Sequence, residues 1–232
     1  LKELAKSDDK YLRASAVLAL SMTSIPDAEA YALPLVKSDD ALLKQVGAEA
    51  LDLCGGKDAV APLVALLQDP DEDVVMAAVS ALPELNRKTG STDMVEPLIK
   101  LMESPNYILV TTAAQSLGTI GDERAIEPLL KLFKASAPKL KSMGCGYMCG
   151  YVASVGSSLS QIGGDKVAGE LLSLLEDPNP RVRREAAYAL AGMGKKLTKG
   201  EDLVVKRIQE ETDLSLRDTL IARARPARTR SY

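Results

Sequence analysis

The segment from Gly163 to Gly194 predicts two helices joined by a tight turn, and copies of this segment recur along the chain. The predicted helices span 167–176 and 182–191, each with apolar residues at helical spacing. Between them, Asp177-Pro178-Asn179-Pro180 ends the first helix, because proline cannot continue a helix and restricts the residue before it. One such hairpin cannot bury its apolar face alone, so it needs neighbours to stack on.

Leu190 closes the second helix of this hairpin and provides a reference position for aligning the repeats, which recur at intervals of about 31 to 42 residues. Its counterparts are Leu20, Leu51, Leu82, Leu117 and Leu159, with Ala224 in a weaker seventh copy. We therefore predict seven units, at about 1–27, 28–56, 57–90, 91–121, 122–164, 165–196 and 200–224. The first unit is partial, the fifth and last are irregular, and the Arg-rich residues 225–232 are expected to be a disordered tail.

Composition agrees with an all-α fold. The chain has one Phe and no Trp, so Leu, Ala, Val and Met must fill the core, which suits closely packed helices. We expect Ser or Asp in the mid-repeat turns to cap the second helices. Pro62, Pro97 and Pro128 share one aligned position near a helix start, where proline is tolerated. No strands are predicted.

The absence of histidine excludes several kinds of active site. It removes His-based triads, His metal sites and the usual general base near neutral pH. A net charge of −3 and the lack of a basic stripe argue against nucleic acid as a partner. No apolar run is long enough for a membrane span, and three Cys do not suggest a disulfide framework, so a reducing, cytoplasmic location is expected. We expect no catalytic residue, no cofactor and no metal.

Three quoted segments carry a family resemblance. Gly55–Leu63, Gly121–Leu129 and Asp177–Ala187 resemble HEAT repeats, most closely the short subtype found in phycobilisome lyases. The resemblance implies a right-handed α-solenoid whose second helices line the concave face. It also implies an alternative function, as a subunit of a bilin chromophore lyase-type complex. A DNA-base enzyme built on HEAT-like repeats is a third interpretation, and the absent Trp and absent basic stripe argue against it.

One position near the start of the second helices is basic in some units and apolar in others. It holds Arg13, Lys44, Arg183 and Arg217, each after a turn that contains Asp, and these predict a structural ladder that ties turns together. In the middle units it holds Val75, Val110 and Val152. These valines either pack between repeats or mark a drier surface for a partner.

The third and seventh positions of the second helices should face the concave side. These rows are polar or small and carry little charge in the middle units, which suits a peptide or protein segment. The alternative is a merely solvated inner face. The candidate partner-binding residues are Gln45, Glu49, Met76, Ser80, Thr111, Gln115, Ala153, Ser157, Arg184 and Tyr188.

The fifth unit departs from the repeat. Its longer connector carries Lys134, Lys139 and Lys141 and is either a contact loop or a tolerated surface insertion. Cys145 and Cys149 lie four residues apart, too few ligands for zinc, and are either small buried residues or a regulatory thiol. We expect a non-enzymatic scaffold that binds a protein or peptide, with a neighbouring repeat or subunit at its N-terminal end.

Overall fold

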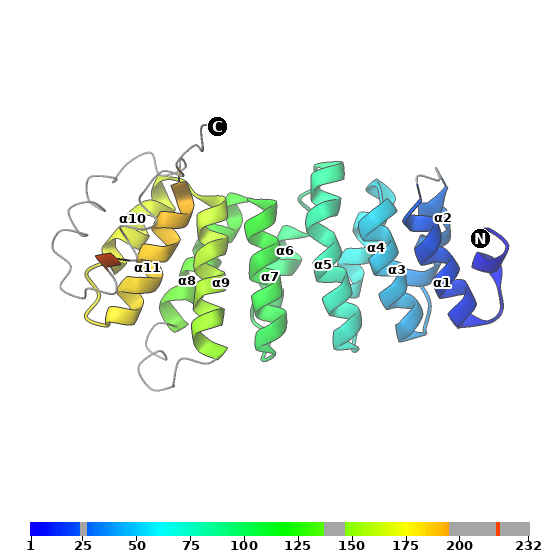
Figure 1. The fold of residues 1–232 in the computed structure, drawn as a ribbon, viewed down its shortest axis with the longest axis horizontal. Helices are drawn as coiled ribbons and strands as arrows, with labels where there is room; N and C mark the ends of the chain where they lie inside the picture. Colours follow the sequence, from blue (N-terminus) through cyan, green and yellow to red (C-terminus); the bar gives the residue numbers. More distant parts are fainter. Residues whose placement is uncertain (24–26, 137–146, 195–216, 219–232) are drawn as a thin grey trace, which may run out of the picture. The chain divides into compact units, whose positions relative to one another are not determined.

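The computed structural model describes residues 1–23, 27–136, 147–194 and 217–218, and the secondary structure of these residues is helical (Figure 1). The all-α repeat architecture expected from the sequence is confirmed. The chain divides into two compact units, Leu1–Ile120 (unit 1) and Gly121–Tyr232 (unit 2), and each is considered separately.

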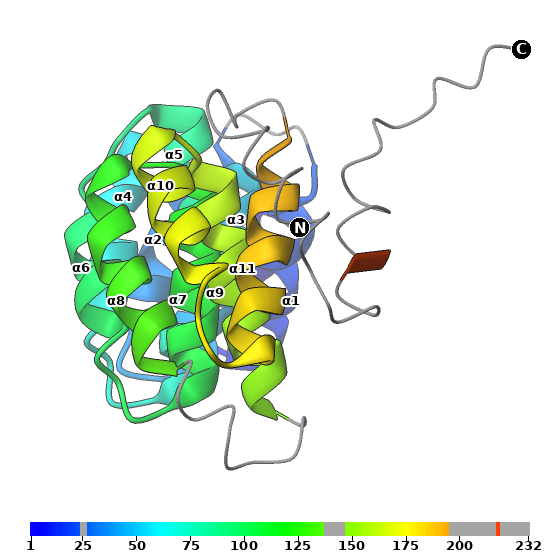
Figure 2. The ribbon, with the colours of Figure 1, turned by 90° about the vertical axis from the view of Figure 1, so that its left-hand side faces the viewer.

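Unit 1 places its helices in two layers. α2, α4 and α6 lie on one side, and α1, α3, α5 and α7 lie on the other (Figure 2), where each contacts the next member of its row. The elements are η1 (Leu4–Lys6), α1 (Lys10–Ser21), α2 (Ala28–Val36), α3 (Ala41–Cys54), α4 (Lys57–Leu66), α5 (Glu72–Thr89), α6 (Val95–Leu101) and α7 (Tyr107–Ile120). The first and second helices of successive hairpins therefore segregate to opposite faces of the unit.

The turns between paired helices repeat one hydrogen-bonding motif. In α1, the Asp9 carboxylate accepts the backbone N–H groups of Tyr11 and Leu12 at 2.8 and 3.1 Å, and the Ser7 hydroxyl accepts the N–H of Asp9 at 3.2 Å. These bonds satisfy donors that a helix start leaves unpaired. The same two positions are Ser38 and Asp40, Asp69 and Asp71, Ser104 and Asn106, and, in unit 2, Asp177 and Asn179. The predicted Asp caps are confirmed, and Asn fills the same role in two turns.

The leucines used to align the repeats form the core of unit 1. Leu20, Leu51, Leu82 and Leu117 are all 0% exposed. Full burial of a leucine side chain contributes about 1.5 to 3 kcal/mol, so this one column stabilises the stack substantially. The sequence repeat is therefore a record of the positions that face the neighbouring helices.

The apolar residues at the otherwise basic position pack inside the protein. Val75 and Val110 are 4% exposed and Val152 is 1% exposed. This burial favours packing between helices over a dry partner-binding surface. The valines therefore contribute to the core.

The basic residues at that position contact turns. Arg13 donates from Nη1 to the carbonyl oxygen of Ser7 at 2.9 Å, and Arg183 donates likewise to that of Asp177 at 3.0 Å. Lys44 reaches forward to the next turn and pairs with Asp69 at 2.7 Å. In the predicted ladder, Arg13 and Arg183 thus each bond to the backbone of the turn that precedes their own helix, whereas Lys44 joins its helix to the next turn. Arg217 is exposed.

α3 approaches α2 closely at Gly47. A Cβ atom at this position would lie 2.8 Å from both the backbone nitrogen and a side-chain carbon of Val36. Contacts this short require a shift of the α2 backbone. Glycine therefore sets how closely these two helices can pack.

α5 contains a proline whose missing N–H is compensated by another helix. Pro83 cannot donate to the carbonyl of Val79, four residues earlier. The buried hydroxyl of Ser116 in α7 donates to that carbonyl at 3.0 Å. A side-chain bond between two neighbouring hairpins thus replaces a bond within one helix.

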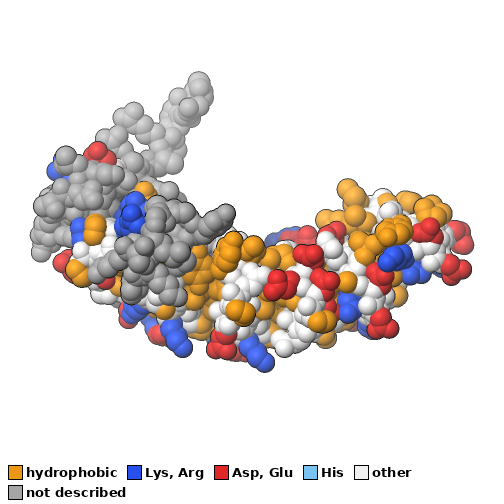
Figure 3. Space-filling model, turned by 90° about the horizontal axis from the view of Figure 1, so that it is seen from below, with side chains coloured by type: hydrophobic (Ala, Val, Ile, Leu, Met, Phe, Trp, Pro, Cys, Tyr) orange, Lys and Arg blue, Asp and Glu red, His pale blue; other side chains and the backbone are white. Residues whose placement is uncertain are grey.

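Large apolar side chains are exposed at the end of unit 1 that carries η1 and α1 (Figure 3). Tyr11 is 65% exposed and Met22 is 74% exposed, and Leu1, Leu4 and Leu12 are also exposed. Most of the large apolar side chains that the described residues expose therefore lie at this end.

Unit 2 repeats the hairpin pattern, and its core packs a large aromatic residue against a glycine. Its described elements are η2 (Glu123–Ala125), α8 (Ile126–Ser136), α9 (Tyr147–Ile162), α10 (Asp165–Leu174) and α11 (Pro180–Met193). Phe133 is fully buried, and its ring lies 3.1 Å from where a Cβ of Gly156 would stand. The glycine leaves room for the single Phe of the chain. Apart from residues 217–218, the predicted seventh unit and the tail lie outside the described residues.

Candidate binding groove

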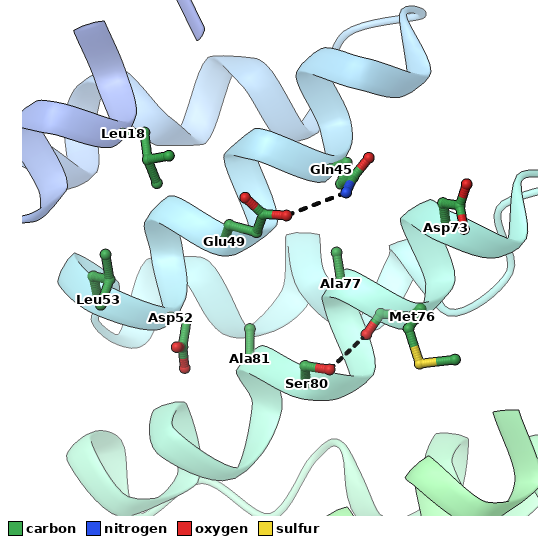
Figure 4. Close-up of a pocket in the computed structure, with 10 residues that line it drawn as sticks. All are labelled: Leu18, Gln45, Glu49, Asp52, Leu53, Asp73, Met76, Ala77, Ser80 and Ala81. Atoms are coloured by element: carbon green, nitrogen blue, oxygen red, sulfur yellow. Dashed lines mark hydrogen bonds between the residues drawn. The ribbon is translucent and has the colours of Figure 1, made fainter. Parts of the chain in front are cut away.

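A groove crosses the second-helix face of unit 1 where α1, α3 and α5 lie side by side (Figure 4). Its volume is about 370 Å³. The lining residues come from these three helices and are Leu18, Gln45, Glu49, Asp52, Leu53, Asp73, Met76, Ala77, Ser80 and Ala81. In α3 and in α5 the lining residues recur three and four positions apart, so within each of these helices they share one face.

Polar groups in the groove are held by short-range bonds within their own helices. The Gln45 side-chain amide donates to the carboxylate of Glu49 at 3.2 Å, and the Ser80 hydroxyl donates to the carbonyl of Met76 at 2.9 Å (Figure 4). The second bond leaves the hydroxyl oxygen available as an acceptor. The carboxylate of Glu49 retains further acceptor capacity.

Carboxylates give the groove its charge. Glu49, Asp52 and Asp73 line it, and none of its lining residues is Lys or Arg. Partial burial raises the pKa of the Asp52 carboxyl, the Lys88 ammonium counteracts part of this effect, and the Glu84 carboxylate adds to it. The groove therefore favours positive charge.

The cation that acts on Asp52 is bonded to backbone. Lys88 in α5 donates from Nζ to the carbonyl oxygens of Asp52 and Leu53, at 2.7 and 2.9 Å. These carbonyls lie in the last turn of α3, where a cation also complements the negative end of the helix dipole. Lys88 thus joins α5 to the end of α3 and is not itself part of the lining.

Four of the ten predicted partner-binding residues meet in this groove: Gln45, Glu49, Met76 and Ser80. Thr111 and Gln115 are at least partly exposed on α7 of unit 1, outside the lining, and Thr111 donates to the carbonyl of Tyr107 at 2.7 Å. In unit 2, Ala153 and Ser157 are exposed on α9, and Arg184 and Tyr188 are partly exposed on α11. Arg184 pairs with the adjacent Glu185 at 3.1 Å.

The predicted partner-binding set left out six of the ten lining residues, namely Leu18, Asp52, Leu53, Asp73, Ala77 and Ala81. Leu18 stands one repeat before Glu49, at the equivalent position of α1. The other five lie three or four residues along the helix from one another or from a predicted position, so a wider helical face would have included them.

Of the connector lysines and the cysteines in the irregular fifth unit, only Lys134 has a described side chain. Lys134 pairs with Glu170 at 2.6 Å, which ties α8 to α10, whereas Lys139, Lys141, Cys145 and the side chain of Cys149 lie outside the described residues.

Cys54 is a free thiol whose pKa is raised by burial. Within the described ranges, no three His, Cys, Asp or Glu side chains are placed to hold a metal ion. Among the described residues, every helix is too short or too polar to cross a membrane.

Two family models match the sequence. One, described as HEAT repeats, matches residues 1–83 and 77–142, and a second, described as HEAT repeat, matches residues 169–197. A sequence search of curated proteins found no match. The family matches fall on both units of the structure.

Solved structures with the same architecture include a natural complex and engineered proteins. The complex of CpcE and CpcF of phycocyanin lyase from Nostoc contains a chain 26% identical to this one, with a TM-score of 0.57 over 84% of this chain and 75% of that one. An engineered protein is 20% identical, with a TM-score of 0.53 over 83% of this chain and 96% of its own. Another is 21% identical, with a TM-score of 0.52 over 96% and 66%. The engineered proteins share the fold.

Proposed function

Because the chain belongs to the HEAT-repeat family, we propose that it is a non-enzymatic scaffold that binds a protein or peptide segment along its second-helix face. The observation that carries the proposal is the groove between α1, α3 and α5. It combines exposed apolar surface with carboxylate, amide and hydroxyl groups, as protein-binding surfaces do. Repeat proteins bind through such extended surfaces.

A pair of matched substitutions tests this proposal. Ala77→Arg places a bulky side chain in the groove, whereas Ala65→Arg makes the same change on an exposed position of α4, in the other layer. Proteins that the wild-type chain captures from the source cells should also be captured by Ala65→Arg. The amount captured by Ala77→Arg should be at least about tenfold lower. Circular dichroism would establish that both variants are folded. Equal retention by the two variants would contradict the proposal.

The remaining predicted positions lie on second helices of each unit. Thr111 and Gln115 in unit 1, and Ala153, Ser157, Arg184 and Tyr188 in unit 2, are proposed as further contacts along the second helices. Lys134 lies in the last turn of α8 and not in the connector predicted from the sequence. Together with Lys139 and Lys141, which follow it in the sequence, it is proposed as a separate contact.

The apolar end of unit 1 supports a second contact. We propose that a neighbouring repeat or subunit covers the exposed Tyr11 and Met22. Replacing both with Glu should lower the mass of any complex seen by light scattering. An unchanged mass would contradict this contact.

A second candidate function rests on the similarity to the CpcE and CpcF complex. The chain would then be one subunit of a bilin chromophore lyase-type complex. Incubation with a partner subunit of the same repeat type, a bilin and apo-phycocyanin should attach the bilin covalently, as measured by fluorescence of the denatured product. Attachment that is no faster than without this chain would exclude the candidate.

A further inference from the structure

We propose that the groove of unit 1 binds a basic segment of a partner protein, with a Lys or Arg side chain among its carboxylates and aliphatic neighbours against its apolar wall. This inference rests on the proposed scaffold function and specifies its partner. It is argued from charge, from the apolar lining and from size.

The charge of the groove is one-sided. In the described structure no ion pair involves Glu49, Asp52 or Asp73, although lysines and arginines pair with acids elsewhere on unit 1. Lys88, the cation that acts on Asp52, already donates to two backbone carbonyls. An arriving cation would thus meet carboxylates that form no ion pair within the described structure, and it would gain charge-assisted hydrogen bonds.

The apolar wall fits the flanking residues of such a segment. Leu53 is 48% exposed, and Leu18 and Met76 are partly exposed. Methionine adapts to irregular contacts, and the long methylene chain of Lys or Arg can itself cover apolar surface. The small side chains of Ala77 and Ala81 line the groove beside these residues and leave space for the segment.

The size of the groove favours an extended segment. A volume of about 370 Å³ lies at the small end of the range for ligand clefts, about 300 to 1,000 Å³, and admits a few side chains rather than a whole helix. Glu49 and Asp52 lie three residues apart in α3, Asp73 lies in the first turn of α5, and no metal-binding cluster is found among the described side chains. Spread charge of this kind matches spaced side chains better than a single ion. Nucleic acid and acidic peptides would be repelled.

Selection from a random 12-residue peptide library would test the inference. Peptides that bind the wild-type chain and fail to bind Ala77→Arg are groove-dependent. We expect them to be enriched in Lys and Arg, and we expect added salt to weaken their binding.

Two charge variants with matched net charge then separate the groove from the rest of the surface. Glu49→Gln with Asp52→Asn and Asp73→Asn should weaken these peptides at least about tenfold. Glu103→Gln with Asp58→Asn and Asp8→Asn removes three exposed acids outside the groove and should leave affinity unchanged.

Each outcome separates the two proposals. Groove-dependent peptides without basic enrichment, or basic peptides that still bind the neutral groove, would overturn the basic-segment inference and leave the scaffold function intact. A library that yields no groove-dependent peptide would overturn both. Basic peptides lost equally by the two charge variants would show a non-specific effect of net charge and would also overturn the inference.

Discussion

Asp69 shows how one side chain serves two parts of the repeat. Its carboxylate accepts from Lys44 Nζ at 2.7 Å and from the backbone N–H of Asp71 at 3.0 Å, and its side chain is 7% exposed. The Lys44 hydrogen bond, aided by the N–H of Asp71, lowers the pKa of the Asp69 carboxyl. The same bond raises the pKa of Lys44.

Asp69→Asn should lower the thermal unfolding midpoint by about 2 °C at neutral pH. A lowered folded-state pKa gives stability that is present above the unfolded value, about 3.9, and is lost as pH falls through the folded value. The difference between wild type and variant should therefore shrink below about pH 4. Calorimetry from pH 7 to pH 3 measures it, and a difference that grows on acidification would contradict this account.

Gly47 lets α2 and α3 approach closely because it has no Cβ atom. Gly47→Ala should destabilise the protein by about 1 to 3 kcal/mol, because the added carbon would press on the backbone of Val36. Gly169→Ala, in α10, is a matched control with nothing within 4 Å of the new carbon, and it should stabilise by about 0.5 to 1 kcal/mol. Urea unfolding compares the two, and effects of the same sign would refute the steric explanation.

At the scale of the element, α5 depends on α7 to complete its hydrogen bonding. Its 18 residues continue past Pro83 and end at Thr89, and the residue that caps this end is Gly90, whose φ of 70° suits glycine. The cost of the proline falls on the carbonyl of Val79, which Ser116 satisfies. The helix is thus complete only in the presence of the next hairpin.

Ser116→Ala should destabilise the protein by about 1 to 3 kcal/mol, because the Val79 carbonyl would lose its partner in a buried position. Adding Pro83→Ala restores an N–H four residues along the helix and should recover part of the loss. Denaturant unfolding of the single and double variants gives the coupling energy. Strict additivity would show that the two sites act independently.

At the scale of the whole molecule, the two units have separate cores. Unit 1 is organised by a column of leucines, whereas unit 2 also buries Phe133 against Gly156. Local stability in repeat proteins is a sum over units and their neighbours, so damage to one core should be felt most strongly nearby.

Phe133→Ala should lower stability by about 3 to 5 kcal/mol. Native-state hydrogen exchange should show lost protection in α8, α9 and α11 and much smaller changes in α3 and α5. Equal loss across both units would show that the chain unfolds as one cooperative body.

The repeat itself was largely predictable from the sequence, and the groove only partly so. Leu20, Leu51 and Leu82 could be placed in the core because burial constrains both residue type and spacing. Glu49 and Ser80 could be placed on the exposed face by the same helical period. The width of the groove could not be predicted, because it depends on the offset and separation of α3 and α5.

Two side-chain partners, one across hairpins and one within a hairpin turn, could also not be predicted from the sequence. Lys88 bonds to the last turn of α3 because of where two helices of different length end. Arg13 bonds to a turn carbonyl, although the nearby Asp residues suggested a carboxylate. Both depend on backbone positions that a repeat period does not specify.

The bond between Ser116 and Val79 also bears on how the chain folds during synthesis. α5 leaves the ribosome before α7, so the Val79 carbonyl must first be bonded to water. It is buried and given its protein partner only when the following hairpin docks. The third hairpin, formed by α4 and α5, therefore reaches its final hydrogen bonding only after the fourth, formed by α6 and α7, has been made. A ribosome that pauses between the two would hold a nascent chain whose Val79 carbonyl is still bonded to water.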